Sequence, residues 1–231
     1  MNHKKTAAVL ACAGSGSRMQ GSCGDKLLYD DRGLPVAAYT LLAYDRAETV
    51  DLLVVVTREE LVPLYRSFKE KYGLRKELLV TVGGSTRTES VLKGARAVPA
   101  DYGFVAVGDG ARPLIRPREI DATVRAAWES GAAALGVHLV DTVKEVRDGR
   151  IVRTVPRETL VGIQTPQVFG RALYLELTER AMAEGGSFTD DASIFEHYGK
   201  EVSFVEGRRD NIKITTPEDL ALFRALMEEQ P

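Results

Sequence analysis

The 231-residue chain has few of the residues that mark disulfide-rich or histidine-based metal proteins. Its two cysteines, Cys12 and Cys23, are too few for a disulfide framework and favour a reducing compartment. Its three histidines, His3, His138 and His197, lack the spacing of metal ligands, and no Ser-His-Asp arrangement is evident. The sequence therefore gives no nucleophile and no histidine-based metal site.

Long apolar runs and an excess of positive charge are also missing. No apolar run is long enough to cross a membrane, and the N-terminal residues lack the core and cleavage pattern of a signal peptide. The net charge is −2 and the isoelectric point is about 6.0, so no basic field favours nucleic acid. We therefore expect a cytoplasmic protein with neither a membrane nor a nucleic-acid partner.

Strand and helix patterns alternate along most of the chain. Strand patterns cover 52–56, 78–82, 104–107 and, more loosely, 132–140, and helical patterns cover 36–46, 59–71, 89–97 and 119–129. This alternation predicts an α/β fold with a mostly parallel sheet covered by helices on both faces. The length fits one domain over 1–231. Ligands of such sheets bind beyond the carboxyl ends of the strands, so the loops after strands are the most informative.

The segment from 138 to about 159 breaks this alternation. Asp148 and Gly149 form a strong two-residue turn signal between two alternating segments, which predicts a β-hairpin. An exposed hairpin is marginally stable alone, so an arm clasped by a second subunit would explain it. A hairpin folded back on its own domain is an equal alternative.

The loop after the first strand pattern has the features of a triphosphate cradle. The apolar run that ends at Ala13 leads into Gly14 and Gly16, then Arg18, and Lys26 follows eight residues later. Glycines let backbone N–H groups approach an anion, and a guanidinium matches phosphate oxygens. The third glycine of a Rossmann fingerprint and the Gly-Lys-Ser/Thr of a P-loop are both missing. A glycine turn without a ligand is the alternative.

Two further loops contain acids and cations. Asp109 directly follows a strand pattern and is well placed for a divalent metal, with Arg112 three residues on for a second phosphate. Asp210 and Lys213 stand beside a short strand and could supply a second carboxylate and a cation for developing charge. An Asp-Gly turn with a surface arginine is the alternative at Asp109. These residues suit phosphoryl-type transfer by positioning and charge neutralisation.

The loop at 83–90 could admit a base ring, since it has adjacent glycines and Ser90 offers a hydroxyl. A helix cap by Thr86 or Thr88 explains the loop equally well.

The polar arm residues Thr142, Lys144 and Arg157 are by themselves typical of a solvated face. Asp190 or Thr189 is most simply a helix N-cap, and Thr216, Pro217 and Asp219 read as a helix start.

Together these motifs resemble the family of 2-C-methyl-D-erythritol 4-phosphate cytidylyltransferases of the non-mevalonate isoprenoid pathway. The resemblance covers nearly the whole chain in the correct order. Its motifs are Ala13-Gly-Ser-Gly-Ser-Arg-Met19, Gly83-Gly-x-x-Arg87 with Ser90, Asp109-x-Ala-Arg-Pro113, Asp141-Thr-Val-Lys144, Thr154-Val-x-Arg157, Gln164-Thr-Pro-Gln167, Thr189-Asp-x-Ala-Ser193 and Glu206-Gly-x-x-x-Asn-Ile-Lys213.

The resemblance implies a Rossmann-like nucleotidyltransferase fold, Mg²⁺, CTP and a polyol phosphate as substrates, and a homodimer whose arms reach the partner's site. It also implies residue roles. These are catalysis by Arg18, Lys26 and Lys213; nucleotide binding by Ala13, Gly14, Gly16, Gly84, Ser85 and Ser90; acceptor binding by Arg112, Thr142 and Arg157, the last two from the partner's arm; and metal binding by Asp109 and Asp210.

The chain departs from the family pattern on the nucleotide side. It has Asp25-Lys26-Leu27 where Pro-Lys-Gln is usual, Cys12 for Ala, Ser85 for Asp, Gly108 for His and Gly110 for Ala. Two other functions stay open: a ribitol-5-phosphate cytidylyltransferase, which shares several motifs, and a nucleotide-binding homologue without turnover. The match of the arm motifs favours methylerythritol phosphate.

Overall fold

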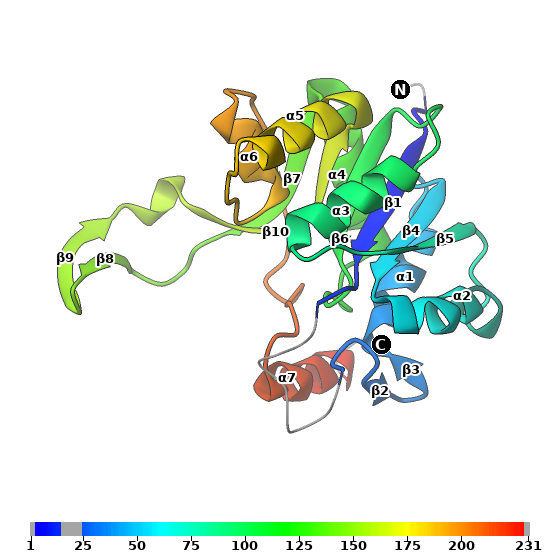
Figure 1. Cartoon of the computed structure of the whole chain (residues 1–231). Helices are drawn as coiled ribbons and strands as arrows, with labels where there is room; N and C mark the ends of the chain where they lie inside the picture. Colours follow the sequence, from blue (N-terminus) through cyan, green and yellow to red (C-terminus); the bar gives the residue numbers. More distant parts are fainter. Residues whose placement is uncertain (1–2, 15–24, 229–231) are drawn as a thin grey trace.

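The computed structural model describes residues 3–14 and 25–228. Its centre is a seven-stranded sheet in the order β11-β7-β10-β6-β1-β4-β5 (Figure 1). The strands are β1 (Thr6–Ala11), β4 (Leu52–Thr57), β5 (Glu77–Val82), β6 (Phe104–Asp109), β7 (Ala132–His138), β10 (Val161–Gly170) and β11 (Ser203–Glu206). Only β10 runs antiparallel to its neighbours, β6 and β7; the other pairs are parallel. The predicted mostly parallel sheet is confirmed.

Helices cover both faces of this sheet, as predicted. One face packs against α1 (Val36–Arg46), α2 (Val62–Lys71) and α4 (Pro117–Ser130), and the other against α3 (Arg87–Ala97), α5 (Arg171–Ala183) and α6 (Asp191–His197). Successive strand residues point to opposite faces. Ala8 and Leu10 of β1 therefore enter the first core, whereas Ala7 and Val9 enter the second. None of the described helices is long and apolar enough to span a membrane.

Local signals explain where several helices start. Thr86 Oγ1 accepts the N–H of Glu89 at 3.1 Å at the start of α3, and Asp190 Oδ1 accepts that of Ser193 at 3.0 Å at the start of α6. These are N-caps, so the cap interpretation holds for both positions. The last helix, α7 (Pro217–Glu228), begins at the predicted proline.

A small hairpin and α7 lie together beyond the carboxyl ends of the central strands (Figure 1). The hairpin consists of β2 (Asp30–Asp31) and β3 (Leu34–Pro35), and Arg224 of α7 lies 3.1 Å from Asp31. The short 3₁₀ helix η2 (Glu59–Leu61) leads into α2. The pairing of hairpin and α7 matters because Lys26 precedes the hairpin and Lys213 precedes α7.

The predicted β-hairpin is present as β8 (Val143–Arg147) and β9 (Arg150–Val155), followed by the 3₁₀ helix η3 (Arg157–Thr159). Its turn residues Asp148 and Gly149 have φ of 49° and 74°, the positive values that a two-residue type I′ turn requires. The hairpin projects from the rest of the protein as an arm (Figure 1). The alternative of a hairpin folded back on its own domain is therefore wrong.

Two glycines at the end of β6, Gly108 within the strand and Gly110 just after it, are explained by the side chains that face them. A Cβ on Gly110 would lie 2.4 Å from Cys12 Sγ, and one on Gly108 would lie 2.5 Å from the Tyr44 hydroxyl. Cys12 is buried and burial raises the pKa of its thiol to about 12, so it acts as a neutral packing group. The departures at positions 12 and 110 therefore compensate each other in space.

Replacing Gly110 by alanine should destabilise the protein by about 1–3 kcal/mol, because the added methyl overpacks against Cys12. In a Cys12→Ala background the same substitution should cost less than half as much. Urea unfolding of the wild type, both single variants and the double variant measures this coupling. An equal loss in both backgrounds would show that the two positions are independent.

Candidate functional site

Two cavities open at the carboxyl edge of the central strands. The first has a volume of about 460 Å³ and the second about 290 Å³. The first is lined by Ala11, Ala13, Gly14, Lys26, Leu27, Gly84, Ser85, Thr86, Arg87, Ser90, Asp109, Ala111, Lys213 and Thr215. The second is lined by Arg87, Asp109, Arg112, Ile163, Gln164, Thr165, Gln167, Thr189, Asp190 and Lys213. Among the described residues, Arg87, Asp109 and Lys213 line both cavities and therefore form their junction.

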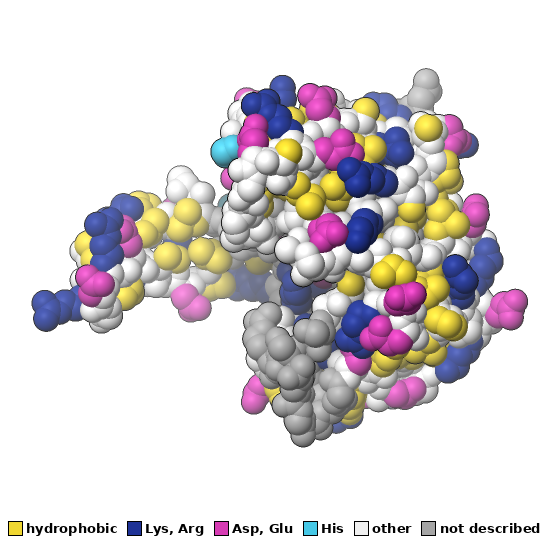
Figure 2. All heavy atoms as spheres, in the orientation of Figure 1, with side chains coloured by type: hydrophobic (Ala, Val, Ile, Leu, Met, Phe, Trp, Pro, Cys, Tyr) yellow, Lys and Arg dark blue, Asp and Glu magenta, His cyan; other side chains and the backbone are white. Residues whose placement is uncertain are grey.

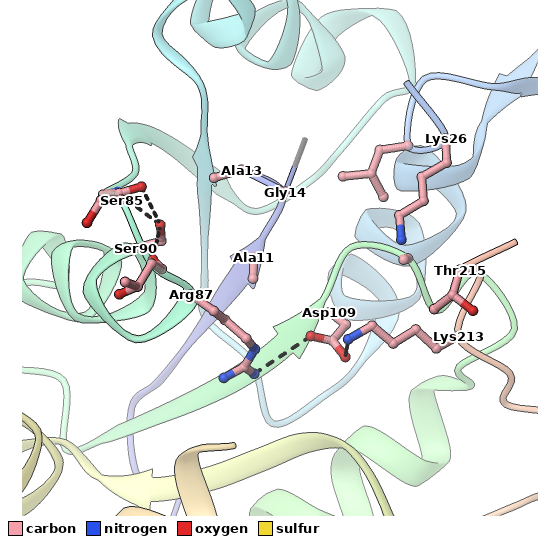
Figure 3. A pocket seen from close by; sticks show the side chains of 14 residues that line it. Ala11, Ala13, Gly14, Lys26, Ser85, Arg87, Ser90, Asp109, Lys213 and Thr215 are labelled. Atoms are coloured by element: carbon pink, nitrogen blue, oxygen red, sulfur yellow. Dashed lines mark hydrogen bonds and ion pairs between the residues drawn. The ribbon is translucent and has the colours of Figure 1, made fainter. Parts of the chain in front are cut away.

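Asp109, the last residue of β6, is the centre of this junction (Figure 3). Lys213 Nζ lies 2.9 Å from its Oδ2, and Arg87 Nη2 lies 3.7 Å from its Oδ1 on the opposite side. Arg112 Nε lies 3.7 Å from Oδ2. Burial by itself would raise the pKa of Asp109, but Lys213, Arg87 and Arg112 outweigh it and hold the pKa below its ordinary value. Asp109 is therefore a carboxylate at neutral pH.

The two lysines expected for catalysis both line the first cavity. Lys26 Nζ donates to the Ile214 carbonyl oxygen at 2.7 Å, which ties the segment before β2 to the segment before α7. Lys213 is half-exposed, unlike the buried Asp109 that it contacts, so its ammonium can also reach a ligand. Of the expected glycine loop, Ala13 and Gly14 line this cavity, whereas Gly16 and Arg18 lie outside the described residues.

The loop between β5 and α3 lines the first cavity with Gly84 and Ser85, and the start of α3 adds Ser90. Ser90 Oγ accepts the N–H of Gly84 at 2.9 Å and donates to the Thr86 carbonyl at 2.8 Å, so it supports the loop. The carboxylate of Glu89 folds back over the loop and accepts both the N–H and the hydroxyl of Ser85. Ser85 replaces the usual Asp of this loop, but a carboxylate is still present there from Glu89.

A Cβ at Gly84 would lie 2.2 Å from Glu89 Cδ, so a larger residue there would displace the Glu89 carboxylate from the loop.

The second cavity is polar and is held together by amide groups. Arg112 Nη1 donates to the Asn211 carbonyl at 2.7 Å, and Asn211 Nδ2 donates to Gln164 Oε1 at 2.9 Å. The N–H of Asp109 donates to Thr165 Oγ1 at 3.1 Å, so β10 and β6 are joined at the junction. Arg112, which the resemblance assigns to acceptor binding, thus lines the second cavity.

Asp210 does not line either cavity. Its Oδ2 lies 2.7 Å from Arg208 Nη1, and Arg116 Nη2 lies 3.9 Å from the same oxygen. Its Oδ1 is buried and has no hydrogen-bond partner among the described residues. No hydrogen bond or ion pair of the described residues joins Asp210 to Asp109. The metal pair Asp109 and Asp210 stays a prediction.

The arm residues Thr142 and Arg157 do not line either cavity of their own chain. Both are exposed, and Arg157 Nη1 donates to the Val140 carbonyl oxygen within the arm. This placement agrees with the expectation that they act in a different subunit and does not test it.

Sequence reasoning missed the role of Arg87 at the junction and of several polar residues of the second cavity. The motifs that contain Arg87, Gln164, Thr165, Gln167 and Thr189 were recognised, but no partner was assigned to them. Their contacts cross long distances along the chain: Gln167 Nε2 donates to Asp190 at 2.9 Å, for example. A single sequence holds no signal for such pairs.

The fold and the site define an α/β protein with a charged junction between two cavities, an arrangement that suits the nucleotidyltransferase class. The family model of 2-C-methyl-D-erythritol 4-phosphate cytidylyltransferase matches residues 6–229. A protein of that name from Pelotomaculum thermopropionicum is 41% identical over 226 residues, which is 97% of this chain and 94% of that protein. The chain therefore belongs to the 2-C-methyl-D-erythritol 4-phosphate cytidylyltransferase family and is an enzyme of the cytidylyltransferase type.

Solved structures agree with this assignment. A 4-diphosphocytidyl-2C-methyl-D-erythritol synthase from Anaerococcus prevotii superposes with a TM-score of 0.87 at 28% identity, covering 99% of this chain and 100% of that one. A 2-C-methyl-D-erythritol 4-phosphate cytidylyltransferase from Thermus thermophilus gives 0.77 at 30% identity, covering 95% and 98%.

Replacing Ser85 by alanine should raise the pKa of Glu89 from about 2 toward its ordinary value, because the Ser85 hydroxyl is the largest cause of the depression. The backbone N–H of Ser85 and the Lys93 ammonium remain, so the rise should be partial. An NMR titration of the side-chain carboxyl carbons measures it.

The sign follows from linkage: a depressed carboxyl pKa stabilises the fold above the unfolded pKa, and this stabilisation is lost as pH falls through the folded pKa. In Ser85→Ala the total stabilisation should therefore be smaller, and its loss should be complete at a higher pH. Glu184 serves as a control, because its pKa is lowered by Arg180 and Tyr198, which lie outside α3 and the loop before it, and should not move. An unchanged pKa of Glu89 would contradict the proposed contact.

Proposed function

We propose that the chain transfers the cytidylyl group of CTP to 2-C-methyl-D-erythritol 4-phosphate at the junction of the two cavities. The first cavity would hold CTP and the second the acceptor. The observation that carries this proposal is the shared lining: Arg87, Asp109 and Lys213 belong to both cavities, so the reacting phosphates of both substrates would meet there.

The reaction balances without a protein nucleophile. An oxygen of the acceptor phosphate attacks the α-phosphorus of CTP, the bond from that phosphorus to the α–β bridging oxygen breaks, and pyrophosphate leaves. A phosphate monoester carries between one and two negative charges at neutral pH, so the attacking oxygen needs no general base. The protein's part is to bring two anions together and to neutralise the charge that develops.

The described cations are suitably placed for that part. Lys213 would stabilise charge on the α-phosphate, Lys26 would neutralise the triphosphate, and Arg112 would hold the acceptor phosphate. Arg18 belongs to the same proposal from the resemblance alone. Ala13, Gly14 and Gly16 would cradle the triphosphate, and Gly84, Ser85 and Ser90 would face the cytosine.

Two carboxylates, Asp109 at the junction and Asp210 outside the cavities, have the chemistry for a divalent cation of the Mg²⁺ type. Mg²⁺ takes one or two carboxylates and completes its shell with phosphate oxygens and water, so it needs no all-protein cage. Asp109 is ionised at the junction, and the buried Oδ1 of Asp210 has no hydrogen-bond partner among the described residues. We infer that these two carboxylates would hold the ion. When bound, the ion would neutralise triphosphate charge.

The arm supports a homodimer. It exposes the apolar side chains of Val146, Ile151 and Val152, and a two-stranded hairpin is marginal in water on its own (Figure 2). A partner subunit that contacts these side chains would also receive Thr142 and Arg157 near its second cavity. We therefore propose that each active site is completed by the partner's arm.

Pyrophosphate release from CTP and Mg²⁺ tests the reaction. Release should occur with 2-C-methyl-D-erythritol 4-phosphate and not with ribitol 5-phosphate, as the family match and the arm motifs favour. Release with ribitol 5-phosphate alone would contradict the proposed acceptor. A folded protein that binds CTP but releases nothing with either acceptor would be a nucleotide-binding homologue without turnover.

Replacing Arg157 by alanine should raise KM for the acceptor about tenfold or more, because a charge-assisted phosphate contact is lost, and change the CTP affinity less than twofold. Steady-state kinetics with each substrate varied in turn measures the two effects. Equal damage to both substrates would contradict an acceptor role for Arg157.

Co-expression of Arg157→Ala and Lys213→Ala subunits with different tags tests whether the arm acts across the dimer. The isolated mixed dimer has one site with both residues intact only if the arm serves the partner. It should then show about half of the wild-type activity per dimer, while each variant alone is weak. A mixed dimer as weak as its parents would show that the arm serves its own chain.

A further inference from the structure

Arg87 occupies an unusual place between two buried carboxylates. Its guanidinium lines both cavities, and its Nη1 lies 2.7 Å from Asp191 Oδ2. Its Nη2 lies 3.7 Å from Asp109 Oδ1, which is too long for a hydrogen bond. Arg87 is therefore held by Asp191 and only faces Asp109.

Asp191 is itself held in place by a second hydrogen bond, from Tyr174. It is the first residue of α6 and its side chain is 1% exposed, and its Oδ1 accepts the hydroxyl of the fully buried Tyr174 at 2.7 Å. A buried carboxylate needs both a counter-charge and satisfied lone pairs. Arg87 supplies the first and Tyr174 helps to supply the second, so the three side chains form one chain of contacts from α5 through α6 to α3.

This chain of contacts has a consequence at the junction. A guanidinium beside a lone carboxylate closes to a hydrogen-bonded pair of about 2.7–2.9 Å. Without Asp191, Arg87 would do so with Asp109 and would compete with Lys213, which lies 2.9 Å from Asp109 Oδ2. With Asp191 present, Arg87 stays 3.7 Å away and Nη2 keeps its hydrogens for another acceptor.

We propose that Arg87 contacts a substrate phosphate at the junction and that Asp191 and Tyr174 are positioning residues that aim it. The inference rests on the proposed function, since it assigns these residues to the same transfer. Asp191 and Tyr174 touch no substrate; they act through Arg87. A merely structural contact between α3 and α6 is the competing explanation.

Kinetics of the full-length chain separate the two explanations. Asp191→Asn and Arg87→Gln should each lower kcat about 100-fold, and Tyr174→Phe about tenfold, with KM for CTP changed less than threefold. Because Asp191 acts through Arg87, Asp191→Asn should have almost no further effect in the Arg87→Gln background. Losses of kcat that multiply in the double variant would overturn the proposal.

Tyr174→Phe keeps both charges and the shape of the core, so it gives the same test if Asp191→Asn fails to fold. Its effect on kcat should likewise disappear in the Arg87→Gln background. Tyr198→Phe is the control: it removes another phenol–carboxylate hydrogen bond, 2.8 Å from Tyr198 at the end of α6 to Glu184 at the end of α5, and neither residue lines a cavity. Tyr198→Phe should leave kcat unchanged, and a loss equal to that of Tyr174→Phe would favour the structural explanation.

A binding measurement keeps this inference distinct from the proposed reaction. The Arg87 side-chain N–H signals, identified in ¹⁵N NMR spectra by their loss in Arg87→Gln, should shift when CTP or 2-C-methyl-D-erythritol 4-phosphate is added. In Asp191→Asn that shift should disappear or become much smaller. If the wild type releases no pyrophosphate, the proposed function fails and this shift still decides the role of Arg87. Arg87 signals that do not shift when either ligand is added would overturn the proposal.

Discussion

The carboxylate of Asp109 is the interaction on which the rest of the site depends. It lies at the end of a central parallel strand, where its neighbours in the sheet exclude water from one side. A buried carboxylate costs much free energy unless cations compensate it, and here Lys213, Arg87 and Arg112 do so. In turn, the carboxylate holds three mutually repelling cations within 3.7 Å of its oxygens. An incoming phosphate therefore meets positive charge that is already in place.

This constraint explains why distant elements converge. Arg87 comes from α3, Arg112 from the loop after β6, and Lys213 from the segment before α7. The small β2–β3 hairpin is joined to α7 by Arg224 and Asp31, and Lys26 donates to the Ile214 carbonyl in the same region. The sheet thus fixes the acid, and the connecting segments bring the cations to it. Catalysis by positioning requires cations that are already held in place, because donors that reorganise during the reaction contribute less.

Much of the fold followed from local patterns in the sequence. The helix over 36–46 was predicted with its observed bounds, and the arm was predicted from the positive-φ preference of Asp148 and Gly149. The direction of the arm could not be predicted, because an exposed hairpin and one folded back have the same alternation. The helix was predicted to start at Glu89 but starts at Arg87, because Thr86 is the cap. The sequence alone could not decide between a cap by Thr86 and one by Thr88.

The site was less accessible to sequence reasoning. Lys213 and Asp109 were both recognised, but their direct contact emerges only from the fold. Asp191 and Arg87 are 104 positions apart, and nothing local marks them as a pair. Cys12 and Gly110 looked like two separate departures from the family until the space between them was visible. Asp210 lies beside Arg208 and lines neither cavity, and its expected part in a metal site stays a prediction.

The most direct test of this account is the turnover of Asp109→Asn, a variant that keeps the size of the side chain and removes its charge. The account predicts a fall in kcat of about 100-fold or more, because the cations lose the anion that fixes them and one proposed metal ligand is lost. The dissociation constant for CTP, measured by calorimetry, should change less than tenfold, since Lys26 and the glycine loop remain. A variant that keeps more than a tenth of the wild-type kcat would contradict the central role of Asp109.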